Sequence, residues 1–185
     1  MHTRLTILFR LVLALAAAGG VAACATSPPP SDPHPLQEPV EALYLNYHAM
    51  EEVRKDLHLR AQHHLPLPGD EFRNIRSAAL AVGQANRAAY GQWSLLSITE
   101  YIKDSHQRDF FTLRQRDLTL ARQQTIEALE TMTIYAAFIT DRDALELLER
   151  SRRLMEGHVA LYDRMAGILR PLANPPASAG AVRPL

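Results

Sequence analysis

Two arginines hold positions in this 185-residue sequence at which a charged side chain is least expected. Arg54 and Arg152 each fall where a repeating apolar pattern should continue, and each follows a glutamate (Glu51 and Glu149) by three residues. Because a buried unpaired arginine is costly, we expect the aliphatic stems to lie in the core and the guanidinium groups to pair with these glutamates at its edge. The alternative is a polar layer that fixes helix register, or a ligand pocket in which both arginines bind an anion.

Met50 and His158 are a second pair that could carry chemistry. Counted from Pro39 and Pro171, they stand at similar heights if the first and last helices are antiparallel neighbours. This pair resembles the haem ligands of soluble four-helix b-type cytochromes, a methionine of the first helix and a histidine of the last. His158, however, lies beside the core position Val159, so we expect Met50 to fill the core and His158 to flank it at the surface. No cofactor is therefore predicted, with haem as the alternative.

Other kinds of chemistry find little support in the sequence. A net charge of zero excludes a strongly basic nucleic-acid binder, and a single cysteine excludes intrachain disulfides and cysteine-rich zinc sites. Glu-x-x-His pairs, which bind di-iron centres in bundles, are absent, and the adjacent His63 and His64 point about 100° apart on a helix. We therefore predict no metal site. Because phosphate-binding loops and nucleophile motifs are also missing, we expect a protein that is not an enzyme.

Apolar residues recur at alternating spacings of three and four, which is the 3.5-residue period of helical bundles. The expected core positions are Leu43, Tyr47, Met50 and Leu57; Phe72, Ile75, Ala79, Val82, Ala89, Trp93 and Leu96; Phe111, Leu118, Ala121, Ala128, Met132, Tyr135 and Ile139; and Leu145, Leu148, Met155, Val159, Tyr162 and Leu169. This pattern predicts an all-α fold, an antiparallel up-down-up-down four-helix bundle over residues 39–172. The alternative is an open pair of helical hairpins completed by a second subunit.

Boundary signals divide these four segments. Pro39 suits a first helical turn, and the prolines at 66 and 68 break the chain before Asp70, a candidate N-cap. Residues 140–143 resemble a cap before the last helix. One continuous helix over 70–140 would be about 105 Å long, which is improbable for a small domain. We therefore predict a turn in the polar segment 103–109.

The N-terminal 24 residues have the parts of an export signal. Arg4 and Arg10 precede an uncharged stretch of 13 residues, too short for a permanent membrane span of about 20 residues. The stretch ends at Val21-Ala22-Ala23-Cys24, which resembles the lipobox of bacterial lipoproteins. The resemblance implies that residues 1–23 are a cleaved signal peptide and that Cys24 is diacylated and becomes the N-terminus. Two or three acyl chains anchor a protein stably.

The segments that flank the helices are rich in proline and small residues. Residues 24–38 hold five prolines, so we expect the lipidated cysteine to be followed by an extended, disordered linker. Residues 173–185 are similarly biased and are predicted to be a disordered tail. In lipoproteins of this type an aspartate after the cysteine often retains the protein in the inner membrane. Here that residue is Ala25, which favours the outer membrane, with the domain facing the periplasm.

These observations together predict a membrane-anchored lipoprotein with a structural or protein-interaction role in the cell envelope. Its expected partners are the membrane, through the lipid on Cys24, and an envelope protein, with no nucleic acid. The second helical segment is rich in alanine and contains Gly83 and Gly91, which favours close helix packing or a docking groove for a partner. The alternative from another class is a periplasmic bundle that binds an anion at the arginine layer, or haem.

Overall fold

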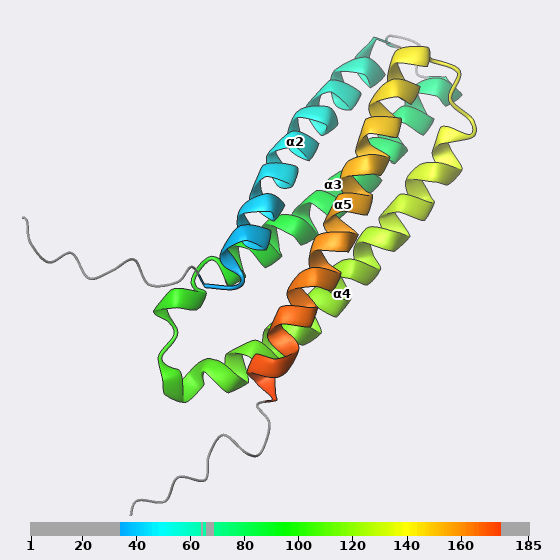
Figure 1. Cartoon of the computed structure of the whole chain (residues 1–185). Helices are drawn as coiled ribbons and strands as arrows, with labels where there is room; N and C mark the ends of the chain where they lie inside the picture. The colour runs from blue at the N-terminus through cyan, green and yellow to red at the C-terminus, as the bar shows by residue number, and fades with distance from the viewer. Residues whose placement is uncertain (1–33, 64, 66–68, 175–185) are drawn as a thin grey trace, which may run out of the picture. The chain divides into compact units, whose positions relative to one another are not determined.

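The computed structural model describes residues 34–63, 65 and 69–174, and within this part of the chain it contains four α-helices and no strand. The helices are α2 (Gln37–Gln62), α3 (Asp70–Leu96), α4 (Asp104–Ala136) and α5 (Arg142–Ala173), with a short 3₁₀ turn η1 at Thr99–Tyr101 (Figure 1). The predicted all-α class is therefore confirmed. The predictions for residues 1–33, which include the signal peptide and Cys24, lie outside the described residues.

Each helix packs along its sequence neighbours, and α2 also packs along α5 (Figure 1). Arg60, in the last turn of α2, pairs with Asp141 directly before α5 at 2.6 Å. Near the other end of the same two helices, Nη1 of Arg164 on α5 donates to Oε1 of Glu38 on α2 at 2.9 Å. These two links join the last turn of α2 to the start of α5, and the first turn of α2 to the second half of α5.

The helix boundaries follow local chemistry, with three corrections to the predictions. The disordered linker predicted over 24–38 is wrong at its end, because Leu36 is 1% exposed in the core and α2 begins at Gln37. Pro39 does lie in the first turn of α2, and Oδ1 of Asp141 accepts a hydrogen bond from the backbone of Ala144 at 3.0 Å, so the predicted cap of the last helix is confirmed. Asp70 is not an N-cap: Gly69 holds that position, and Asp70 is the first helical residue. The predicted turn near 103–109 exists but comes earlier, at residues 97–103.

The last helix extends slightly further than expected. Proline 171 lies inside its final turn, and α5 continues to Ala173, a buried residue that was predicted to begin the disordered tail. Proline 171 has no N–H to donate to the carbonyl of Gly167, so it removes one backbone hydrogen bond, and α5 ends two residues later. The prediction for residues 175–185 lies outside the described residues.

The core consists of two apolar clusters. The first cluster contains Met50, Val53, Leu57, Ala61, Ile75, Ala78, Ala79, Ala81, Val82, Ala85, Ala128, Met132, Ile139, Ala144, Leu148 and Met155. The second contains Leu36, Val40, Leu43, Ala89, Leu96, Phe111, Leu118, Ala121, Tyr162, Met165, Leu169 and Ala173. Every helix contributes to both clusters, and four alanines of α3 in the first allow its neighbours to approach closely.

Two of the expected core positions on α5 are wrong by one residue. His158 is 0% exposed, whereas Val159, which was predicted to face the core, is only partly buried. Similarly, Ala144 is fully buried and Leu145 is 37% exposed. From Met155, a step of three followed by four and a step of four followed by three both reach the next buried residue, so spacing alone does not separate the two registers.

Candidate functional site

Arg54 lies on α2 with 38% of its side chain exposed and is paired with Glu51 one turn earlier. Its Nε and Nη2 atoms donate to the two carboxylate oxygens of Glu51 at 2.9 and 2.6 Å. From α3, Nδ2 of Asn86 donates to Oε2 of Glu51 at 3.0 Å. The hydrogen bonds with Arg54 lower the pKa of Glu51 and raise that of Arg54, so both groups remain charged. The guanidinium group is thereby held in one orientation.

Arg152 is paired in the same manner on α5. Its Nε and Nη2 atoms donate to Glu149 at 2.8 and 2.7 Å, and its Nη1 atom donates to Glu156. These bonds raise the pKa of Arg152. Both arginines therefore pair at the edge of the core, as the glutamates three residues earlier predicted. In the described part of the chain, no hydrogen bond or ion pair joins Arg54 to Arg152, so they do not form a shared polar layer.

Arg54 lines an open groove between α2 and α3 that has about 310 Å³ of free volume. The residues of this α2–α3 groove are Tyr47, Glu51, Arg54, Gly83, Asn86, Arg87 and Tyr90. Gly83 lies beneath the side chains of Arg54 and Arg87. A Cβ atom added there would lie 3.4 Å from Cδ of Arg54 and 3.7 Å from Nη1 of Arg87. The side chains of Arg54 and Arg87 therefore both approach the space above Gly83, at van der Waals distance from the position that a methyl group would occupy.

Arg87 contributes an unpaired positive charge to this groove. It is exposed on α3 and makes no hydrogen bond or ion pair with another described residue. Arg87 also borders a larger groove of about 550 Å³ between α3 and α4, which it lines together with Glu127. The lining of that groove contains no aromatic side chain, and its two charged residues, Arg87 and Glu127, have opposite charges. The smaller α2–α3 groove combines more groups that can recognise a ligand, because its lining contains a paired arginine, a second arginine without a partner among the described residues, and two tyrosines.

Five rings extend from this groove along the surface of α2 and α3. Tyr47 and Tyr90 have ring centroids 5.3 Å apart, Tyr90 and Trp93 are 5.5 Å apart, and Trp93 and Tyr44 are 4.7 Å apart. His48 contacts Tyr44 edge-on at 4.3 Å. We call these residues the aromatic ladder. It contains the only tryptophan and three of the six tyrosines of the chain, and with the groove it forms the α2–α3 face.

Met50 and His158 are both 0% exposed. The expectation that Met50 fills the core is confirmed, since it belongs to the first cluster, but the expectation that His158 lies at the surface is wrong. Neither ring nitrogen of His158 has a hydrogen-bond partner within the described residues. Burial lowers the pKa of His158 to about 4, opposed by the nearby backbone of Asn46, so the ring is neutral at pH 7. A haem between these two side chains would have to displace residues that now fill the core.

A polar layer does exist, but it is formed by residues that the sequence did not single out for this role. On α3, α4 and α5 the two apolar clusters meet at Asn86, Thr125 and His158, which are 3%, 0% and 0% exposed. The hydroxyl group of Thr125 donates a hydrogen bond to the backbone carbonyl of Ala121 at 2.9 Å. Oδ1 of Asn86 has no hydrogen-bond partner among the residues that the structure describes. Polar side chains at core positions are known to fix helix register at a cost in stability, which suits this layer.

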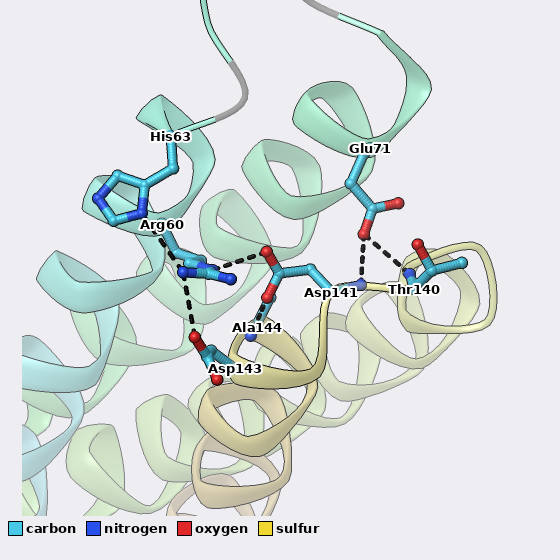
Figure 2. Close-up of polar contacts among 7 residues, drawn as sticks. All are labelled: Arg60, His63, Glu71, Thr140, Asp141, Asp143 and Ala144. Atoms are coloured by element: carbon cyan, nitrogen blue, oxygen red, sulfur yellow. Dashed lines mark hydrogen bonds and ion pairs between the residues drawn. The ribbon is translucent and has the colours of Figure 1, made fainter.

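A cluster of charged residues links the end of α2 and the start of α3 to the start of α5 (Figure 2). Nε and Nη1 of Arg60 reach Asp141 at 2.6 Å and Asp143 at 3.0 Å. Oε1 of Glu71 on α3 accepts hydrogen bonds from the backbone of Thr140 and Asp141 at 2.8 and 2.7 Å. The cluster therefore fixes the loop between α4 and α5 against α2 and α3. Because these contacts join three helices and the loop before α5, the role of the cluster is structural.

The described residues contain no group of three or more His, Cys, Asp or Glu side chains arranged to hold a metal ion. None of the helices at 37–173 has a segment long and apolar enough to cross a membrane. Comparison with protein-family models, curated proteins and solved structures found no match to this chain.

Proposed function

We propose that this chain is an envelope lipoprotein whose helices present the α2–α3 face to a partner protein. The lipobox at Val21–Cys24 and the preceding apolar segment support the anchor. The absence of an aspartate at position 25 supports an outer-membrane location facing the periplasm. Cys24→Ser tests the anchor, because it removes the only thiol. The variant should retain its signal peptide and incorporate no labelled palmitate, and labelling equal to that of the wild type would contradict the proposal.

We infer that the four helices form an antiparallel up-down-up-down bundle. The links of Arg60 to Asp141 and of Glu38 to Arg164 support opposite directions for α2 and α5. The tie of Glu71 to the loop before α5 supports the placement of the α4 end beside the α3 start. Loops of five to seven residues between successive helices also favour antiparallel neighbours. A rigid bundle of this kind is a suitable support for an exposed binding face.

The composition of the α2–α3 face is the observation that carries the interaction role. Tyrosine, tryptophan and arginine are the residues most enriched in interface hot spots. Here three tyrosines, Trp93, Arg54 and Arg87 gather along two neighbouring helices, and Tyr90 remains 48% exposed. Isolated exposed apolar residues occur on most protein surfaces, whereas clustered rings beside charged groups mark binding sites. A structural role alone does not require the rings to be at the surface.

Affinity capture from solubilised envelopes tests this proposal with paired surface variants. Tyr47→Ser with Tyr90→Ser removes two rings of the ladder. The matched control is Leu120→Ser with Ile134→Ser, which removes two side chains of α4 that are 58% and 62% exposed. We expect the wild type and the control to retain one stoichiometric envelope protein and the tyrosine variant to lose it. Equal capture by all three proteins would show that the α2–α3 face is not the interface.

A further inference from the structure

The charges of the α2–α3 groove are unbalanced. Arg54 and Arg87 contribute two positive charges and Glu51 contributes one negative charge, so these three residues sum to +1. Glu51 already uses both carboxylate oxygens on Arg54, and one of them also accepts from Asn86. It therefore has little capacity left for Arg87. Within the described residues nothing else satisfies the guanidinium group of Arg87.

The two arginines also differ in how firmly they are held. Arg54 is fixed by its fork on Glu51, which leaves Nη1 as its remaining donor group. Arg87 has all its donors available, and its Nη1 atom already lies close to the space above Gly83 that Cδ of Arg54 borders. An incoming anion can therefore bind Arg87 in the bidentate geometry that suits carboxylates, beside an oriented Arg54.

We propose that Arg87, supported by Arg54 above Gly83, is an anchor for a carboxylate of an acidic peptide segment in the partner protein. This inference rests on the interaction role proposed for the α2–α3 face, and it names the chemistry of the partner. The acidic residue is flanked by apolar or aromatic residues, because the aromatic ladder begins directly beside the arginines at Tyr47 and Tyr90. From Arg54 to Tyr44 the face is about 15 Å long along α2, which an extended segment of about five residues spans.

A peptide is favoured over a nucleic acid or a metal for specific reasons. A single excess charge gives a phosphate backbone little to bind, since such contacts use many cations. The groove contributes one carboxylate only, and that carboxylate is committed to Arg54. By contrast, one charge-assisted fork beside stacked rings is typical of a peptide anchor in a protein interface.

Selection of peptides on the full-length lipoprotein in detergent micelles provides the test. A library of random 12-residue peptides is displayed on phage and selected against the wild type and, in parallel, against Arg87→Gln. The matched control is Arg76→Gln, which removes another exposed arginine of the same helix that contacts Phe72 instead of the groove. Trp93, the only tryptophan, reports the affinity of each selected peptide through its fluorescence.

We expect wild-type selections to be enriched in peptides with one Asp or Glu near apolar residues. Replacing that acid by its amide should weaken binding about tenfold, the range of one charge-assisted hydrogen bond. Arg87→Gln should weaken the acidic peptide similarly, and the two changes together should cost little more than either alone. Arg76→Gln should bind like the wild type.

Three results would overturn the inference. They are selected peptides without acidic enrichment, an Arg87→Gln effect that is additive with removal of the peptide acid, and Arg87-dependent binding of cell-wall glycan in place of any peptide. Each of these leaves the proposed interaction role intact if the tyrosine variant still loses its captured envelope protein. If the tyrosine variant captures the envelope protein as well as the wild type does, the proposed function itself is wrong.

Discussion

Acidification should destabilise this protein through one buried side chain, His158. Its ring is 0% exposed between the two apolar clusters, beside Tyr162 at a ring separation of 6.3 Å. Burial lowers its pKa from 6.5 to about 4, because the charged imidazolium would lose its hydration and the nearby backbone of Asn46 offsets only part of that loss. The folded protein therefore resists a protonation that the unfolded chain accepts readily.

The magnitude follows from this difference in pKa. Between pH 6.5 and 4 the unfolded state binds a proton at residue 158 that the folded state does not, so the free energy of unfolding falls as pH falls through this window. A difference of about 2.5 units at 1.36 kcal/mol per unit corresponds to about 3 kcal/mol. This contribution is fully present above pH 6.5 and is lost as pH approaches 4. For a domain stabilised by about 5–15 kcal/mol it is a large share.

Urea unfolding at pH 7, 6, 5 and 4.5, followed by circular dichroism at 222 nm, measures the effect in the full chain. His158→Leu keeps a similar volume and removes the titrating ring, so its free energy of unfolding should fall less steeply with pH than that of the wild type, the remaining slope coming from paired carboxylates such as Glu51. Because two unsatisfied nitrogens are also removed, its stability at pH 7 should equal or exceed that of the wild type by about 1 kcal/mol. His106→Gln, at an exposed residue of α4, should retain the wild-type slope. Parallel slopes for the wild type and His158→Leu would refute the reasoning.

Further predictions concern glycines and a helix cap. Gly91→Ala should raise the free energy of unfolding by about 1 kcal/mol, because the added Cβ would meet nothing within 4 Å. In Gly157→Ala the added Cβ would lie 2.8 Å from Nδ2 of Asn46, and this close contact should cancel the gain in stability. Thermal melting compares the two, and equal gains would contradict the close approach at Gly157. Asp141→Ala should lower stability by at least about 1 kcal/mol through loss of the cap of α5, while Asp143→Ala, at an exposed partner of the same arginine, should change it little. Urea titration measures this pair, and equal losses would show that the cap does not matter.

The sequence predicted those features that depend on periodicity within one helix. The 3.5-residue repeat identified four helices, and the glutamates three residues before Arg54 and Arg152 predicted their ion pairs. Both patterns are local, so no knowledge of neighbouring helices was needed. The register of α5 was wrong at His158, because the two orders of three- and four-residue steps from Met155 are equivalent in sequence.

The candidate site was only partly predictable for the same physical reason. Arg87 and Tyr90 occupy exposed positions of an ordinary helix, and nothing in their local sequence marks them. Their role emerges only when α3 lies along α2 and brings them beside Arg54 and Tyr47. Gly83 was noticed as a small residue that favours packing, but the side chains that use its space became visible only in the structure.

The most direct test of the account is site-specific photocrosslinking in intact cells. A photoreactive phenylalanine analogue is placed at position 90 on the α2–α3 face or at position 120 on α4, where Tyr90 and Leu120 are both exposed. We predict one discrete crosslinked product at position 90, reduced by Arg87→Gln, and none at position 120. Equal products at both positions, or a product at position 120 alone, would contradict the claim that the α2–α3 face binds the partner.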